Sequence, residues 1–152
     1  NVDDIIDIIN VLPHLFRNAV DHGIEQPHVR LANNKDESGT IKIIFQQLIE
    51  KDLKYLIINI QDDGGGIDPI LVKEKYQSIF PEKNLSKYTE KDLQMLIFDP
   101  FFSTKDQSTS ISGRGVGMSA VAQVIQEKGG TINLMSRVGI GTKFEIKIPL
   151  FN

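Results

Sequence analysis

Three polar side chains recur at intervals of four residues near the start of the chain: His14, Asn18 and His22. If this segment is helical, the spacing places two imidazoles and one carboxamide along a single stripe of the helix. A carboxamide oxygen is a hard neutral ligand suited to Mg²⁺, which completes its octahedron with water and substrate phosphates. Each residue alone would be interpreted as a solvated or capping side chain, but three in register favour a functional site.

The stretch 62–68 is acidic and rich in glycine, with Asp62 at its start and Gly64 and Gly66 within it. Such stretches are usually polar turns. A carboxylate at a strand end can also accept a hydrogen bond from the amino group of adenine, whereas guanine would present a carbonyl oxygen there. The glycines would let the backbone approach the base closely.

Glycines alternate in the stretch 112–118, Ser-Gly-Arg-Gly-Val-Gly-Met, directly before a predicted helix. Exposed backbone N–H groups and the positive end of the helix dipole favour a phosphate there. The stretch is neither a Walker loop nor the dinucleotide-binding Gly-x-Gly-x-x-Gly pattern, and the alternative interpretation is a flexible hinge. The stretch 139–142, Gly-Ile-Gly-Thr, is most simply a hairpin turn.

The elements that must position these residues follow from hydrophobic periodicity. Apolar residues at three- and four-residue steps predict a helix over 3–20 that ends at Gly23. Pro13 interrupts this pattern, and it either kinks the helix or separates a short lead-in from the main helix. Further helices are predicted at 69–79, 90–98 and 118–128. Strands are predicted at 40–48, 55–60, 131–136 and 142–149. The remaining polar segments predict a loop with one helical turn at 25–38 and a mobile loop at 103–117. This order predicts an α/β two-layer sandwich, with helices on one face of a mixed, mostly antiparallel sheet.

The composition narrows the class of protein. The 152 residues, 40% hydrophobic and 24% charged, predict a single globular domain. A net charge of -3 gives no reason to propose nucleic acid or a membrane surface as partner. The absence of cysteine fits a cytoplasmic location, and no apolar run is long enough to cross a bilayer. Because the chain begins without Met, we expect a fragment of a larger protein.

Together the four stretches resemble the nucleotide-binding boxes of the Bergerat-fold (GHKL) ATPases, which include histidine kinases, type II topoisomerases, the Hsp90 chaperone and the MutL repair protein. The stretch 98–105, Phe-Asp-Pro-Phe-Phe-Ser-Thr-Lys, is similar to a box that belongs to the histidine kinases. The stretches 17–25 and 112–118, with Pro27 and 30–32 between them, look like chemotaxis kinases of the CheA type. Lys105 and the Phe101-Phe102 pair look more like membrane-sensor kinases, so a cytoplasmic part of a membrane-bound sensor is the alternative location.

The resemblance implies a role for each matching residue. Asn18 would bind Mg²⁺, His14 and His22 would lie near the phosphates, and Asp62 would bind adenine. The resemblance implies further ATP-binding residues: Asp21, Gly64, Gly66, Ile67, Lys105, Gly113, Arg114, Gly115, Val116, Gly117, Met118 and Thr142. It implies a histidine kinase domain that binds Mg-ATP and transfers the γ-phosphoryl to a histidine elsewhere in the parent chain or on a partner, and from there to a response regulator. His14, Asn18 and Arg114 are the expected catalytic residues.

Two other functions stay open: a hydrolytic ATPase of the same fold and a nucleotide-sensing module without transfer activity. Hydrolysing relatives have a Glu four residues before the metal-binding Asn, where it activates water, and this chain has His14 there. A histidine acceptor is already a nucleophile, so transfer needs positioning and charge neutralisation more than a strong base. Whether His14 acts as a base or as a phosphate contact is open.

Overall fold

A computed structural model describes the backbone of residues 2–105 and 117–150 and the side chains of residues 6–102 and 117–150. It contains a sheet of four strands, β1 (Ile41–Glu50), β2 (Leu53–Asp62), β3 (Thr131–Arg137) and β4 (Gly141–Leu150), in the order β1-β2-β4-β3. All three strand pairings are antiparallel. The predicted strands are thereby confirmed, in a sheet with antiparallel pairing throughout.

The first hairpin is longer than the sequence predicts. Glu50 pairs with Leu53, so only Lys51 and Asp52 form the turn. Both turn residues have positive φ angles, 49° and 65°, as the twist of a two-residue hairpin requires. The sequence predicts strands at 40–48 and 55–60, but residues 49, 50, 53 and 54 also belong to the paired strands.

Helix α1 (Val2–Asn18) continues through Pro13 and leads into a π-helical turn, η1 (Ala19–Gly23). Because the helix is continuous, the predicted alternative in which Pro13 separates a short lead-in from the main helix is wrong. Pro13 lies on the exposed side, while Ile8 and Leu15 on either side of it are buried in the core. Packing of this continuous apolar face outweighs the one backbone hydrogen bond that proline removes.

The remaining helices are short. They are α2 (Pro27–Ala32), α3 (Pro69–Ile79), α4 (Glu90–Met95), the 3₁₀-helical turn η2 (Leu96–Phe98), α5 (Pro100–Lys105) and α6 (Met118–Glu127). Helix α3 has the predicted bounds, but α5 was not predicted, and it includes the first residues of the expected mobile loop. Asp99 accepts a hydrogen bond from the backbone N–H of Phe101 at 2.8 Å, as a capping residue does. The sequence Asp99-Pro100, a capping residue followed by a proline at the first helical position, therefore indicates a helix start.

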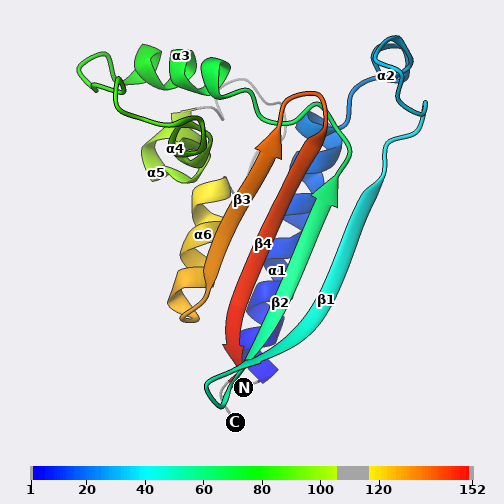
Figure 1. Cartoon of the computed structure of the whole chain (residues 1–152). Coiled ribbons are helices and arrows are strands. Elements are labelled where there is room, and N and C mark those ends of the chain that lie inside the picture. Colours follow the sequence, from blue (N-terminus) through cyan, green and yellow to red (C-terminus); the bar gives the residue numbers. More distant parts are fainter. Residues whose placement is uncertain (1, 106–116, 151–152) are drawn as a thin grey trace.

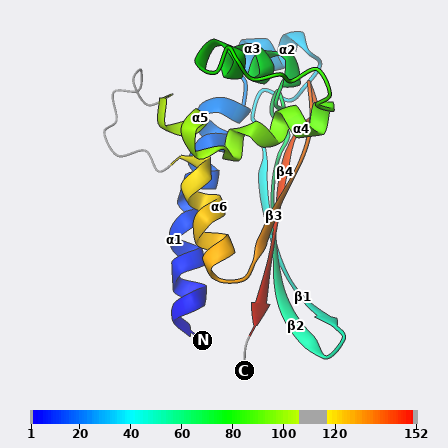
Figure 2. The same ribbon diagram turned by 90° about the vertical axis from the view of Figure 1, so that its left-hand side faces the viewer.

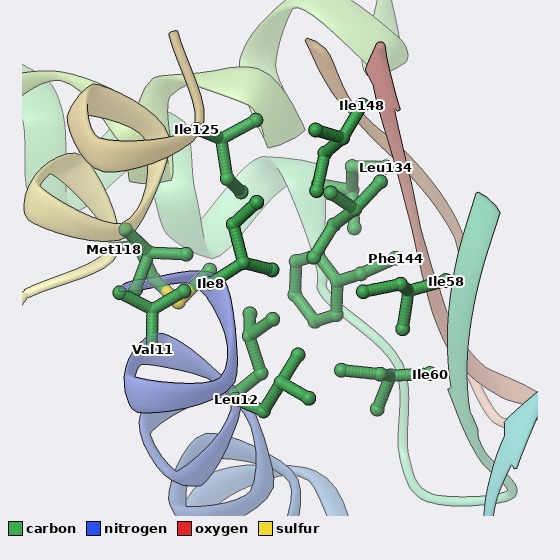
Figure 3. Close-up of a cluster of buried hydrophobic side chains, with 13 residues drawn as sticks. Ile8, Val11, Leu12, Ile58, Ile60, Met118, Ile125, Leu134, Phe144 and Ile148 are labelled. Atoms are coloured by element: carbon green, nitrogen blue, oxygen red, sulfur yellow. The ribbon is translucent and has the colours of Figure 1, made fainter. Parts of the chain in front are cut away.

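Helices α1 and α6 lie side by side on one face of the sheet, and the opposite face has no helix over it among the described residues (Figures 1 and 2). The predicted two-layer α/β sandwich is thus confirmed. Apolar side chains from both layers meet between them (Figure 3), and Leu15, Val121, Ile125 and Ile146 have no exposed surface. No helix in residues 2–105 or 117–150 has the length and apolar character needed to cross a membrane.

A second, smaller apolar cluster lies where α3, α4 and α5 meet, at one end of the sheet. Its buried members are Tyr76, Leu85, Leu93 and Phe102. Tyr76 and Phe102 have ring centroids 5.5 Å apart. This cluster fixes the segment around α5 against the rest of the domain.

Candidate functional site

A cleft with a volume of about 240 Å³ opens at the end of α1, beside the ends of β2 and β4. Its lining combines a few polar side chains with a mostly apolar wall: Asn18, Ala19, His22, Gly23, Asp62, Gly66, Ile67, Ile97, Phe102, Met118, Thr142 and Phe144. An apolar cleft with a few converging polar groups is the usual form of a small-molecule site.

Asp62, the last residue of β2, is the buried carboxylate of this cleft, with only 5% of its surface exposed. Its Oδ1 accepts hydrogen bonds from the backbone N–H of Gly64, at 2.9 Å, and of Thr142, at 3.3 Å. Burial and, to a smaller extent, the charge of Asp63 raise the pKa of Asp62, against the lowering effect of the two N–H groups. Both donors bind Oδ1, so Oδ2 has no hydrogen-bond partner within residues 2–105 and 117–150.

Close backbone contacts surround this carboxylate and require glycine. A Cβ atom on Gly64 would lie 2.0 Å from the carbonyl oxygen of Gly23, whereas one on Gly23 would meet the Asp62 side chain at an ordinary contact distance of 3.4 Å. Gly66 has a φ angle of +74°, and a Cβ there would lie 2.3 Å from the carbonyl oxygen of Arg137. The backbone of 62–66 is therefore held against two other segments of the chain, as the glycine content indicated.

A chain of polar groups connects Thr142 to α4. The hydroxyl oxygens of Thr142 and Ser136 lie 2.9 Å apart, and Ser136 Oγ accepts the N–H of Ile67 at 2.8 Å. Gln94 on α4 is buried and donates from Nε2 to the carbonyl oxygen of Ile67 at 2.7 Å. Ser136 and Gln94 could not be identified from the sequence, because only the fold brings these distant segments together.

Asn18, the last residue of α1, lines the cleft opposite the first residue of α6. Its amide nitrogen donates a hydrogen bond to the sulfur of Met118. The other end of the same amide group is the carbonyl oxygen Oδ1. A hard neutral oxygen in this position fits one corner of a magnesium ion's coordination shell, so the residue present is compatible with the expected metal.

Several predicted residues do not line the cleft. His14 is partly buried on α1 and Asp21 is exposed on η1, and neither contributes to the lining. Gly64 acts behind Asp62, and Gly117 is the N-terminal cap residue of α6. The other predicted residues, Gly113, Arg114, Gly115, Val116 and the side chain of Lys105, lie outside the described part of the chain.

The apolar wall includes residues that the sequence analysis did not assign to the site, among them Ile97, Phe102 and Phe144. Phe102 is buried, whereas its neighbour Phe101 is 70% exposed. Behind Phe102, the hydroxyl of Tyr76 donates to Asp99 Oδ2 at 2.8 Å. Burial, followed by this contact with Asp99, raises the pKa of Tyr76 to about 12. The Tyr76–Asp99 bond thus ties α3 to the segment that begins α5.

We expect replacement of Tyr76 by Phe to lower the free energy of unfolding by about 1 kcal/mol, the usual net worth of one hydrogen bond. Urea denaturation would measure this loss. Tyr88→Phe, at a tyrosine residue that is 36% exposed, is the matched control and should change stability less. Equal losses in the two variants would contradict a specific role for the Tyr76–Asp99 bond.

The fold is a two-layer sandwich with a buried carboxylate at the end of a central strand, a glycine-rich turn beside it and an asparagine in the same cleft. This arrangement fits a nucleotide-binding domain. The family model described as "Histidine kinase-, DNA gyrase B-, and HSP90-like ATPase" matches residues 3–152. The chain belongs to this family, whose nucleotide is ATP.

Individual relatives are similar to the chain over most of its length. It is 39% identical over 146 residues to "Chemotaxis protein CheA" of Halobacterium salinarum, covering 95% of the chain and 21% of the relative. It is 42% identical over 145 residues to the protein of that name from Klebsiella aerogenes, covering 94% and 21%. "Sensor histidine kinase CheAY" of Helicobacter pylori is 37% identical over 146 residues, covering 95% and 18%. The chain therefore spans about a fifth of the length of these relatives.

Proposed function

We propose that this chain is the single ATP-binding catalytic domain of a longer CheA-like histidine kinase, and that it transfers the γ-phosphoryl of Mg-ATP to a histidine on a separate domain. Membership of the ATPase family and the printed names of the relatives support the proposal. The observation that carries the ATP part is the orientation of Asp62, with Oδ1 bound by two backbone donors and Oδ2 left for the base.

Adenine recognition would use Asp62 Oδ2 as the acceptor for the 6-amino group. Guanine has a carbonyl oxygen at that position, so two acceptors would face each other and GTP would be rejected. Ile97 and Phe144 would contact the faces and edges of the base as apolar walls. Gly66 and Ile67 would supply the backbone next to it.

The phosphates would extend from the base toward Asn18, whose Oδ1 would hold the metal, and toward His22, which also lines the cleft. Mg²⁺, when bound, supplies positive charge that offsets the charge of the phosphate oxygens. Lys105, Gly113, Arg114, Gly115 and Val116 complete this part of the proposal from the sequence pattern. His14 and Asp21 are proposed only as outer residues, since neither lines the cleft.

Transfer is favoured over hydrolysis because His14 occupies the position where hydrolysing relatives have the Glu that activates water. The acceptor would be a neutral imidazole, and the domain would act mainly by positioning the phosphoryl group. The partners in this proposal are a histidine-bearing phosphoacceptor domain of the parent protein and, through it, a response regulator. A cytoplasmic location follows from the same proposal, because these partners act there.

The test combines the chain with γ-labelled ATP, Mg²⁺ and the phosphoacceptor domain of its parent protein. We expect label on the acceptor histidine and little release of inorganic phosphate when the acceptor is omitted. Steady release of phosphate by the chain alone, abolished by changing His14, would instead indicate the hydrolytic function. Tight ATP binding with neither transfer nor release would indicate a nucleotide sensor.

Replacing Asn18 by Ala removes the proposed metal ligand. We expect the Mg²⁺ concentration needed for half-maximal transfer to rise about tenfold, since loss of groups that hold a metal typically costs 10- to 100-fold. Asn33→Ala, at the exposed end of α2 and outside the cleft, is the matched control. An unchanged magnesium requirement in Asn18→Ala would contradict the assignment.

A further inference from the structure

Four charged residues form a cluster behind the Asp62 carboxylate, outside the cleft lining. Arg30 on α2 has a side chain only 1% exposed and makes ion pairs with Glu25, at 3.1 Å, and with Asp63, at 3.0 Å. Lys35 makes an ion pair with the other oxygen of Glu25 at 2.7 Å. Nothing in the proposed chemistry uses these residues, yet a buried arginine is costly unless its environment is complete.

The two cations have every N–H donor satisfied. A guanidinium has five such donors, and those of Arg30 reach the carbonyl oxygens of Asp36, Ser38 and Asp63 and the carboxylates of Glu25 and Asp63. The three donors of the Lys35 ammonium reach Glu25 Oε1 and the carbonyl oxygens of Asp63, at 2.9 Å, and Gly64, at 2.7 Å. Both side chains therefore converge on the two residues that follow Asp62.

The Asp63 carbonyl oxygen is the decisive acceptor. It receives hydrogen bonds from both Arg30 Nη1, at 3.2 Å, and Lys35 Nζ. This oxygen and the N–H of Gly64 belong to one planar trans peptide, in which they point in opposite directions. Holding the oxygen toward the cations therefore aims the Gly64 N–H the other way, at Oδ1 of Asp62.

We propose that Lys35 and Arg30 are positioning residues for base recognition, which orient the Asp62 carboxylate through the Asp63–Gly64 peptide. The Gly64 N–H occupies Oδ1 and so presents Oδ2 to the 6-amino group of a bound purine. This inference rests on the proposed role of Asp62 in adenine binding. It assigns specificity to α2 and the loop after it, neither of which lines the cleft.

A second contact limits how the peptide can move. The backbone N–H of Gly65 donates to the carbonyl oxygen of Gly23 at 2.8 Å. The peptide of Asp63 and Gly64 is thus held by the cations on one side and is followed directly by this contact. Without the ammonium of Lys35, the carbonyl oxygen of Asp63 would keep one side-chain donor, Arg30. The carbonyl oxygen of Gly64 would keep no side-chain donor among the described residues.

The test compares two ligands, ATP and purine riboside triphosphate, which lacks only the 6-amino group. Calorimetry on the chain with Mg²⁺ measures both dissociation constants in the wild type and in Lys35→Met. We expect the wild type to bind ATP about tenfold more tightly than the analogue, because one hydrogen bond to a charged group is lost. In Lys35→Met this advantage should fall to about threefold or less, while affinity for the analogue changes less than about twofold.

Lys147→Met is the matched control, since it removes an ammonium that pairs with Glu50 across the sheet, away from the cleft. It should leave the tenfold advantage in place. If Lys35→Met does not fold, Lys35→Gln, which keeps an amide donor, is measured in the same way and should lose part of the advantage.

The outcomes distinguish the role of Asp62 in adenine recognition from the positioning role of Lys35. If the wild type binds both ligands equally, the role of Asp62 in adenine recognition fails. If the wild type prefers ATP and a folded Lys35 variant keeps the full preference, only the positioning role is overturned. Equal loss of affinity for both ligands would show that Lys35 acts on stability of the site alone, and would also overturn the positioning role.

Discussion

Replacing Asp62 by Asn is expected to weaken ATP binding by about 100-fold, because a hydrogen bond to a charged acceptor is lost and an unfavourable contact is created. The carbonyl oxygen of the new side chain would keep the N–H groups of Gly64 and Thr142. Its NH₂ group would then replace Oδ2 and face the amino group of adenine, placing donor against donor. Calorimetric titration with Mg-ATP measures the loss.

The same substitution should stabilise the nucleotide-free fold at neutral pH. Burial raises the pKa of Asp62 above its ordinary value of 3.8, so the ionised form is less favourable in the folded chain than in the unfolded chain. Stability from this group is therefore fullest at low pH and is lost as the pH rises through the folded-state pKa. The melting temperature of Asp62→Asn should exceed that of the wild type at pH 7, and the difference should shrink toward pH 4.

Asp68→Asn is the matched control for both measurements. Asp68 lies in the same turn, does not line the cleft and caps α3 by accepting the N–H of Ile70. Asn is as good a cap as Asp, so ATP affinity and melting temperature should stay close to the wild type. An unchanged affinity in Asp62→Asn, or an equal loss in both variants, would remove Asp62 from adenine recognition.

Replacing Gly64 by Ala is expected to lower the free energy of unfolding by about 2 to 3 kcal/mol and to weaken ATP binding as well. The new Cβ would lie 2.0 Å from the carbonyl oxygen of Gly23 and 2.9 Å from Asp62 Oδ1, so the backbone at Gly23 and the side chain of Asp62 both have to move. That movement displaces the N–H that binds Oδ1. Urea denaturation and calorimetry measure the two effects.

The neighbouring substitution Gly65→Ala provides the control. The three atoms nearest to its Cβ would belong to the Glu25 side chain, at ordinary contact distances beginning at 3.6 Å. We expect a change in stability of less than about 0.5 kcal/mol, as at a typical surface position, and unchanged ATP binding. If Gly64→Ala proved as stable as Gly65→Ala, the close approach of the two backbone segments would be refuted.

Much of the fold could be predicted because its elements have clear local patterns. Helix α3 begins with a Pro after a capping Asp and has the bounds that the sequence indicates. The elements that were missed depend on tertiary packing. Pro13 stays inside α1 because apolar residues on both sides are buried, and α5 contains residues of weak helix propensity that its capping Asp99 and the cluster around Phe102 hold in place.

The site residues also fall into two groups: those that local motifs predict and those that only the fold identifies. Asp62, Gly66 and Thr142 were predicted from motifs whose residues are adjacent in sequence, and all three line the cleft. Gln94, Ser136 and Arg30 were not predicted as site residues, because their polar partners lie 27, 69 and 33 positions away along the chain. Only the folded structure brings such distant polar groups within hydrogen-bonding distance.

The pairing of β2 with β4 places Asp62 directly opposite Thr142, and the same ladder places Ile58 opposite Ile146 and Leu56 opposite Ile148. Successive residues of a strand face opposite sides of a sheet, so a slip of one position would put Lys143 or Gly141 in the place of Thr142. The slip would also move Ile146 and Ile148 out of the core. Buried isoleucines far from the cleft therefore fix the register that places Thr142 beside Asp62.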